Sequence, residues 1–360
     1  MSLRFGSAEE ASLSRDGLLA AYEVLVDGLE QDAYAGAVAL IARHGVIAGF
    51  WALGLRRSVQ PAVAMTHDCI FDLASLTKAI VTAPIILRLS AECRLSLDDP
   101  LSRHLPWTAG SFVGDARVKD LLTHRGGLPA TADIGWAKEP EERHGELLQV
   151  VGETPLPNPV YSDLGYYLLG LVAEAAGQEP LPRLFGRIVQ APLGLVRSGF
   201  GPKDTREQPI VASERRPEGL LEGVVHDGKT RLMGGVAGHA GLFAPALDVA
   251  LYAQAVLDGG SGRLGQMLPA AEAELLLAPQ TPPPERRGLG FFEWGTRDGD
   301  DFFLPAWGHT GFTGTSFAIA PPSGLLVVLL TSRVHPVRRP EERLKSVRSR
   351  FHRAVWESQR

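Results

Sequence analysis

Apolar residues recur with a helical period near both ends of the chain. Between residues 10 and 30 they form one stripe, made of Leu18, Leu19, Tyr22, Leu25, Val26 and Leu29. The final segment has the same period, with Leu344, Val347, Phe351, Ala354 and Val355 on one face and most basic residues off it. Because such a stripe packs against a core, we expect an amphipathic helix at each end. The basic residues of the second helix are interpreted as its solvated face.

Two pairs of apolar runs predict β-hairpins. The first pair spans 36–54 and turns at Arg43-His44-Gly45, and the second spans 315–331 and turns at Pro321-Pro322-Ser323-Gly324. Between the hairpins the pattern predicts helices at 76–93, 117–124, 164–177, 181–190 and 246–258, and a loop at 278–288. We therefore expect one sheet built from both chain ends, a helical insertion packed against it, and a cleft between the two.

Composition narrows the class of protein. The chain has 360 residues, of which 45% are hydrophobic and 21% charged, as in an ordinary soluble globular protein. Its net charge of -5 argues against nucleic-acid binding, and no stretch reaches the roughly 18 apolar residues that span a bilayer. The N-terminus shows no signal peptide, so we expect a cytoplasmic protein, or a periplasmic or secreted one if an export signal has been removed. Nothing in the sequence indicates an oligomeric state.

The cysteines and histidines predict neither a disulfide framework nor a metal site. Cys69 and Cys93 are interpreted as two small buried thiols. Neither has candidate metal ligands beside it, and no zinc-type spacing of cysteine and histidine occurs. We expect no metal and no cofactor.

The tetrapeptide Ser75-Leu76-Thr77-Lys78 is the first candidate for chemistry, and it precedes the apolar run 79–87. On a helix, residues three apart share one face, so Lys78 would lie close enough to take the proton of Ser75. A serine hydroxyl needs such a base to become a nucleophile. A lysine serves as that base if burial or nearby positive charge lowers its pKa, and the apolar run would supply the burial.

Tyr161-Ser162-Asp163 follows two prolines and opens the helix predicted at 164–177. A tyrosine held near a lysine could shuttle protons. The alternative is that Tyr161 is a packed aromatic residue and that Ser162 or Asp163 is the helix N-cap.

His309-Thr310-Gly311 leads into a predicted strand. Glycine beside a strand allows close approach of a substrate, and the N–H of Phe312 could form an oxyanion hole with the N–H of Ser75. The alternative is a glycine-rich turn with an incidental histidine.

In this order the three segments resemble the pattern of the serine β-lactamase and penicillin-binding-protein superfamily, which is S-x-x-K, then Y-x-N or S-x-N, then K-T-G or H-T-G. The tyrosine is similar to that of class C β-lactamases, D-alanyl carboxypeptidases and family VIII esterases. Segments 120–129 and 234–243 also resemble segments of this branch. The likeness runs from about residue 36 to residue 335, nearly the whole chain.

The resemblance implies an α/β fold with an antiparallel sheet flanked by the terminal helices, plus a mostly helical subdomain. We expect one β-lactamase-like domain over 1–360, with the sheet subdomain at about 10–70 and 290–360 and the helical subdomain at about 71–289.

The resemblance also implies a serine hydrolase that acts through an acyl-enzyme on a small ester, amide or β-lactam. Ser75 would attack, and Lys78 and Tyr161 would share the general-base work. The oxyanion would bind to the N–H groups of Ser75 and Phe312. Substrate contacts would come from His309, Thr310, Gly311 and Asp163. An esterase or weak β-lactamase is the first expectation, a D-alanyl-D-alanine carboxypeptidase the second, and a non-catalytic binding protein on the same fold the third.

Two residues depart from the pattern. Asp163 stands where asparagine is usual, and a carboxylate there would pair with Lys78, raise its pKa and disfavour strong β-lactam turnover. His309 stands where classical β-lactamases have lysine, so a substrate carboxylate would be held more weakly, which favours neutral esters or amides. His124 and His239, both beside glycines, are interpreted as structural, and Asp227 as a residue at the cleft edge.

Overall fold

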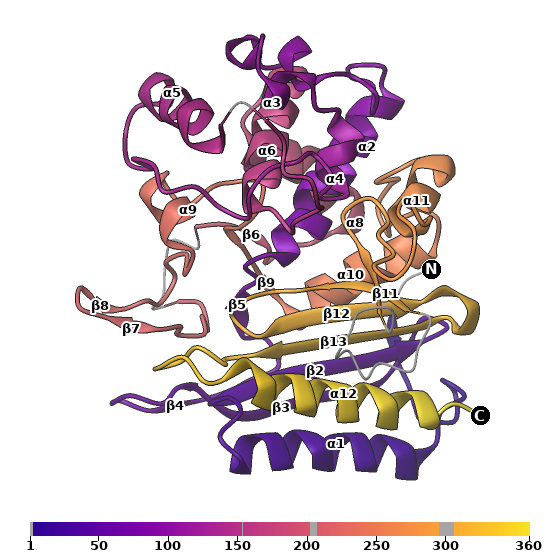
Figure 1. Cartoon of the computed structure of the whole chain (residues 1–360). Coiled ribbons are helices and arrows are strands. Elements are labelled where there is room, and N and C mark those ends of the chain that lie inside the picture. Colours follow the sequence, from indigo (N-terminus) through magenta and orange to yellow (C-terminus); the bar gives the residue numbers. More distant parts are fainter. Residues whose placement is uncertain (1–2, 153, 202–206, 295–305) are drawn as a thin grey trace.

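The computed structural model describes residues 3–152, 154–201, 207–294 and 306–360, and Figure 1 shows them as stacked layers. A main sheet has helices α1 (Arg15–Glu30) and α12 (Glu341–Glu357) on one face. Helix α10 (Ala246–Leu257) packs against the other face, and most of the remaining helices lie beyond it.

The main sheet joins the two chain ends, as predicted. Within the described residues its strand order is β1-β3-β2-β13-β12-β11-β10, with β4 paired to β3. The strands are β1 (Arg4–Phe5), β2 (Gly36–Arg43), β3 (Val46–Arg57), β4 (Val63–Ala64), β10 (Phe292–Trp294), β11 (Ala306–Thr310), β12 (Thr315–Ala320) and β13 (Leu325–Thr331). Strand β1 runs parallel to β3, so the sheet is mixed at this edge rather than wholly antiparallel.

Both predicted hairpins form, and their turns explain the local sequence. The β2–β3 turn places His44 and Gly45 at φ +52° and +79°, the double positive φ that a tight hairpin turn requires. The β12–β13 connection is a short helical turn, η5 (Pro321–Ser323), that ends at Gly324 with φ +61°.

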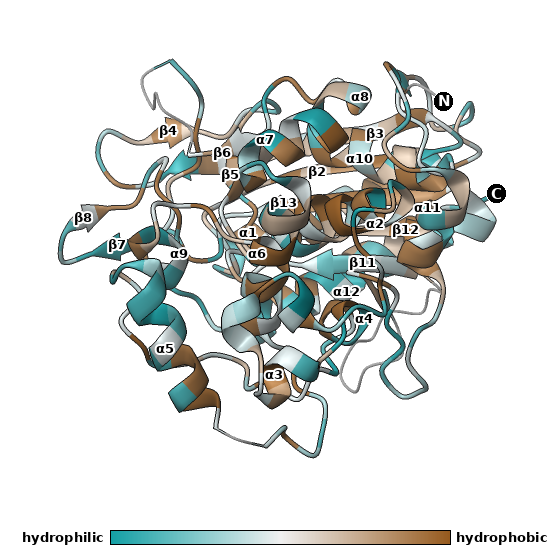
Figure 2. Cartoon of the chain, turned by 90° about the horizontal axis from the view of Figure 1, so that it is seen from above, coloured by the Kyte–Doolittle hydropathy of each residue, from teal (hydrophilic) through white to brown (hydrophobic). Residues whose placement is uncertain are grey.

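Both faces of the central strands are buried, which accounts for their unbroken apolar runs. Along β2, Val38, Leu40 and Ala42 pack into the core on the helical side. The alternating residues Ala37, Ala39 and Ile41 pack into the core under α1 and α12. Seen from above, the central segments, including α2, are hydrophobic, whereas outlying segments such as β7 and α9 are hydrophilic (Figure 2).

The middle of the chain supplies the other elements. Its helices are η1 (Lys78–Thr82), α2 (Ala83–Ala91), η2 (Leu101–Arg103), η3 (Pro106–Thr108), α3 (Phe112–Asp115), α4 (Val118–Leu122), α5 (Pro140–Val151), α6 (Asp163–Gly177), α7 (Leu181–Phe185), η4 (Gly186–Gln190), α8 (Ala191–Leu193), α9 (Gly228–Leu232) and α11 (Ala270–Leu277). Its strands are β5 (Ile70–Asp72), β6 (Gly199–Phe200) and β9 (Leu242–Pro245), which form a small sheet, and the hairpin β7 (Arg215–Arg216) and β8 (Gly219–Leu220).

Among the described helices of eight or more residues, the sequence pattern did not predict α5 and α11. Helix α5 fully buries only Leu147, with Leu148 and Val151 partly buried, so its apolar face is confined to the second half of the helix. Helix α11 buries only Ala273 and Leu276. Helix α10 lies within the range predicted for the helical subdomain but packs against the sheet. The subdomain limits therefore stay a prediction. No helix in the described parts of the chain is long and apolar enough to cross a membrane.

The packing of α12 gives the first testable prediction. Phe351 is fully buried between α12 and the sheet, so Phe351→Ala leaves a cavity and lowers the free energy of unfolding by about 3–5 kcal/mol. Urea denaturation measures this change. Lys345→Ala on the same helix removes only exposed ion pairs and should change it by less than about 0.5 kcal/mol. Equal effects of the two substitutions would contradict the packing described here.

Candidate active site

Ser75 lies in a strained turn between β5 and the π-helical turn η1. Ala74, immediately before it, has φ +47°, a backbone conformation that non-glycine residues rarely adopt. The buried carboxylate of Asp72 holds this turn, because one oxygen accepts the Ala74 N–H at 2.9 Å. Its other oxygen accepts the N–H of His226 at 2.7 Å. One carboxylate thus ties the turn that carries Ser75 to the loop before α9.

Lys78 is fully buried one turn beyond Ser75. Its Nζ donates to Ser75 Oγ at 2.9 Å, to Asp163 Oδ1 at 2.8 Å and to the backbone oxygen of His239 at 3.4 Å. Three acceptors match the three hydrogens of an ammonium group. Burial lowers the pKa of Lys78, but the neighbouring Tyr161 and Asp163 oxygens outweigh burial and raise it above its usual value. The expectation that Asp163 would pair with Lys78 is confirmed.

The segment Tyr161-Ser162-Asp163 places its tyrosine and its aspartate on either side of the N-cap of helix α6. Ser162 is the N-cap of α6, since its Oγ accepts the N–H of Gly165 at 3.1 Å. The Ser162 N–H donates to His124 Nδ1 at 3.0 Å, so His124 fixes this loop as predicted. Tyr161 packs 4.4 Å from the His124 ring and places its own ring 4.8 Å from Lys78 Nζ.

The segment His309-Thr310-Gly311 lies at the end of β11, against the turn that carries Ser75. A Cβ at Gly311 would come within 2.5 Å of the Leu73 carbonyl oxygen and 2.2 Å of Thr315 Oγ1, so only glycine permits this approach. His309 is buried, and its Nδ1 bonds to the backbone oxygen of Thr310 at 2.8 Å. Phe312 is half exposed, and its N–H, like that of Ser75, has no acceptor among the described residues.

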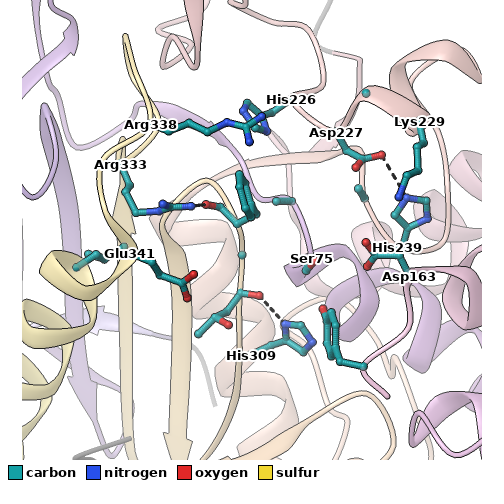
Figure 3. A pocket seen from close by; sticks show the side chains of 18 of the residues that line it. Ser75, Asp163, His226, Asp227, Lys229, His239, His309, Arg333, Arg338 and Glu341 are labelled. Carbon is teal, nitrogen blue, oxygen red and sulfur yellow. Dashed lines mark hydrogen bonds and ion pairs between the residues drawn. The ribbon is translucent and has the colours of Figure 1, made fainter. Parts of the chain in front are cut away.

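These segments meet at a cavity of about 750 Å³ (Figure 3). Every sequence-predicted site residue except the buried Lys78 lines it, namely Ser75, Tyr161, Asp163, His309, Thr310, Gly311 and Phe312. Figure 3 shows Ser75 between two walls, with Arg333 and Arg338 on one side and Asp163, Asp227 and His239 on the other.

Sequence reasoning missed the arginines, and it did not place His239 at the cavity. His239 lines the cavity, and its Nε2 lies 3.3 Å from Asp227 Oδ1 and 3.1 Å from Thr230 Oγ1. Although burial opposes it, the His239 contact holds the pKa of Asp227 well below its usual range. Arg333 and Arg338 follow β13 in a segment without a motif, so only the three-dimensional arrangement brings them to the cavity.

A family model described as Beta-lactamase matches residues 23–350 of the chain. The chain belongs to the beta-lactamase family. It is thus a serine hydrolase of that family, as the sequence pattern predicted. A putative D-alanyl-D-alanine carboxypeptidase of Escherichia coli (strain K12) is 32% identical over 322 residues, which cover 79% of this chain and 74% of the relative. An N-acetylmuramyl-L-alanine amidase of Bacillus subtilis (strain 168) is 32% identical over 355 residues, which cover 86% of this chain and 80% of the relative.

Solved structures of this family share the fold. EstCE1, a hydrolase with promiscuous acyltransferase activity, superposes with a TM-score of 0.73 at 22% identity, covering 94% of this chain and 98% of its own. A class C beta lactamase from Rhodobacter sphaeroides superposes with a TM-score of 0.76 at 18% identity, with the same coverage of 94% and 98%. At this identity the likeness establishes the β-lactamase fold alone.

The Asp72 clamp predicts a particular dependence of stability on pH. Burial raises the pKa of Asp72 to about 6, although the two N–H donors oppose it, and the nearby Asp227 charge adds to the rise. The folded protein therefore binds this proton more tightly than the unfolded chain. That contribution is complete below the ordinary carboxyl pKa and is lost as the pH rises to about 6. Relative to Asp72→Asn, the wild type should lose about 3 kcal/mol of unfolding free energy over this window.

Urea denaturation of both proteins at several pH values between about 3.5 and 7 measures the difference. Asp68→Asn, close by in the chain, is the matched control. Hydrogen bonding to Thr66 and Arg197 lowers the pKa of Asp68 against its burial, so the sign of its difference should be opposite. Parallel stability curves for wild type and Asp72→Asn would contradict a raised pKa at Asp72.

Proposed function

We propose that this chain is a serine amidase that cleaves, through an acyl-enzyme at Ser75, the amide bond between an acyl group and an alanine-type amino acid. The observation that carries the proposal is the ammonium group of Lys78, held 2.9 Å from Ser75 Oγ by Asp163. An amine is a poor leaving group unless it is protonated as the bond breaks. A proton donor fixed beside the nucleophile meets this need. The leaving group of an ester needs such a proton less than the leaving group of an amide does.

The names of the two relatives support this substrate class. A D-alanyl-D-alanine carboxypeptidase and an N-acetylmuramyl-L-alanine amidase both break an amide bond formed by the nitrogen of an alanine. The match extends over 79% and 86% of this chain respectively. Ester cleavage, the first expectation from the sequence, remains compatible with the same site because an ester is the easier substrate.

The proposed reaction uses Lys78 and Tyr161 in different roles. Lys78 donates to Ser75 Oγ and stabilises the alkoxide that forms as Ser75 attacks the carbonyl carbon. Tyr161, which lines the cavity beside Ser75, accepts the Ser75 proton. The N–H groups of Ser75 and Phe312 receive the oxyanion. As the C–N bond breaks, the Lys78 ammonium gives a proton to the leaving amine and recovers one from Tyr161, which holds the proton taken from Ser75. Water then attacks the acyl-enzyme with Tyr161 as base, and Tyr161 returns that proton to Ser75 Oγ as the acyl group leaves.

Asp163→Asn tests which group accepts the Ser75 proton. Removal of the carboxylate takes away an interaction that raises the pKa of Lys78, so this pKa falls. If the ammonium form of Lys78 is the active one, the alkaline limb of the kcat/KM profile moves to lower pH. We expect this shift, with a fall in kcat of about 10-fold because the ammonium is less firmly held.

The pH profiles of wild type and Asp163→Asn provide the measurement. Asp227→Asn is the control, since it removes a cavity carboxylate that has no hydrogen bond to Lys78, and it should leave the alkaline limb in place. If the acid limb moves instead and activity at neutral pH rises, neutral Lys78 is the base and the roles proposed here are wrong.

The function itself is tested by comparing wild type with Ser75→Ala on four substrates: an N-acyl-D-Ala-D-Ala peptide, N-acetylmuramyl-L-alanine, a short-chain p-nitrophenyl ester and nitrocefin. We expect alanine release from at least one of the two amides and a loss of at least about 10³-fold in Ser75→Ala. Ser102→Ala, a serine in η2 that does not line the cavity, should retain wild-type rates.

Two results would count against the proposal. Turnover that survives in Ser75→Ala would exclude Ser75 as the nucleophile. Turnover of only the ester, or rapid turnover of only nitrocefin, would assign an esterase or a β-lactamase instead of an amidase.

A further inference from the structure

Arg287 is a buried cation behind the proposed active site. Its side chain is 8% exposed, and its Cζ lies 6.0 Å from the centroid of the Tyr161 ring. It does not line the cavity around Ser75, and no sequence motif marks it at the end of the loop expected at 278–288. An effect of Arg287 on the reaction would therefore reach the substrate through a neighbouring side chain, and Tyr161 does line the cavity.

The backbone around Arg287 is held on both sides of the residue. The Arg287 N–H donates to Thr281 Oγ1 at 2.8 Å, and the Arg287 oxygen accepts the N–H of Gln280 at 2.7 Å. A Cβ at Gly288 would lie 2.0 Å from the Leu276 carbonyl oxygen, so the chain after Arg287 lies directly against helix α11. The guanidinium thus extends from a fixed point of the fold, as a positioning group requires.

The positive charge of Arg287 is only partly balanced. Its one ion pair within the described residues is with Glu285, whose Oε2 lies 2.8 Å from Arg287 Nη2. The Glu285 side chain is 51% exposed, so water screens its carboxylate. Lys78, whose Nζ lies 4.8 Å from the same tyrosine ring, is instead paired with Asp163 inside the site. A guanidinium is not deprotonated in proteins, so Arg287 adds a permanent positive charge beside Tyr161.

The titratable and charged groups around Tyr161 and Arg287 come from separate segments, namely Lys78, His124, Asp163, Tyr166, Glu285 and His309. The rings of His124 and His309 lie 4.4 Å and 6.1 Å from the Tyr161 ring. Tyr166 donates its hydroxyl hydrogen to a backbone oxygen at 2.8 Å. Burial first and Tyr161 second raise the pKa of Tyr166, although Arg287 opposes them. Tyr166 therefore stays a neutral donor, and Tyr161 is the phenol on which the Arg287 charge can act.

We propose that Arg287 is a positioning residue whose guanidinium stabilises the negative charge of Tyr161 while Tyr161 is the base of the reaction. This inference rests on the role that the proposed function gives to Tyr161. A cation within about 6 Å of an aromatic ring is attracted to its π electrons, and the attraction grows when the ring carries the charge of a phenolate. The phenolate takes the Ser75 proton and becomes a neutral phenol, while Ser75 Oγ bonds to the carbonyl carbon and the negative charge passes to the oxyanion.

Labelling of Ser75 by a fluorophosphonate probe tests this role without a natural substrate. Ser75 loses its proton to the base, its Oγ bonds to phosphorus, and fluoride leaves. Between about pH 5 and about pH 10, Arg287→Gln should move the acid limb of the labelling rate to higher pH by about 1 unit, because the phenolate loses a neighbouring cation. The rate should fall about 10-fold below the limb and stay within about 3-fold of wild type above it.

Further variants keep the test decisive if Arg287→Gln folds poorly. Arg287→Lys keeps the charge and should leave the acid limb near its wild-type position. Glu285→Gln removes the balancing carboxylate and should move the limb to lower pH. Arg286→Gln is the matched control, since Arg286 is 43% exposed and pairs with Glu293 at 3.4 Å, and it should match the wild type. An unmoved limb in Arg287→Gln and Glu285→Gln, or an equal loss at every pH, would overturn the proposal.

Two comparisons separate this inference from the proposed function. Tyr161→Phe should lower the labelling rate about 10²- to 10⁴-fold, and a wild-type rate would overturn both the base role of Tyr161 and the role of Arg287. If Arg287→Gln moves the limb but neither amide substrate releases alanine, the amidase function fails and the role of Arg287 stands. If an amide is cleaved and the limb does not move, the amidase function stands and the role of Arg287 fails.

Discussion

The buried ammonium group of Lys78 is the constraint on which the site depends. Removing a charge from water is costly unless partners replace the lost hydration. Asp163, Ser75 and the His239 carbonyl replace it here, and each comes from a different part of the chain. The start of α6, the turn before η1 and the loop before β9 must therefore meet at one point. The side chain that is proposed to act on Ser75 therefore also determines how the helical part of the chain assembles.

Close backbone approaches make this meeting possible. A Cβ at Gly238 would lie 2.1 Å from the Tyr166 carbonyl oxygen, so the loop with His239 can lie against α6 only because glycine stands there. Thr82 Oγ1 donates to the Gly238 oxygen at 2.6 Å and joins the same loop to η1. On the opposite side, Gly311 lets β11 approach the turn that carries Ser75. Gly238 and Gly311, in two of the sequence segments that resemble the family, are thus explained by contacts around Lys78 and Ser75.

Local patterns in the sequence predicted those features that depend on neighbours in the chain. The hairpins and the terminal helices follow from periodicity and spacing. The pairing of Lys78 with Asp163, which lies 85 residues further along the chain, was expected only from the resemblance to the family. Asp72 and Arg338 were not identified because their partners lie far away in sequence, as in the contact of Asp72 with His226. A lone acidic or basic residue carries no local signal of its role. Helix α5 was missed for a different reason: it fully buries a single leucine, and its apolar face is confined to its second half.

The two walls of the cavity carry opposite chemistry, and this restricts how a substrate can lie. Burial raises the pKa values of Asp163 and Asp227, but Lys78 and His239 respectively outweigh burial and lower them. Both carboxylates therefore stay ionised at neutral pH and repel a second carboxylate. The opposite wall, with Arg333 and Arg338, attracts one. A ligand with a single carboxylate is therefore favoured with that group away from Asp163, and the charge that sets this preference is the same carboxylate that holds Lys78 in place.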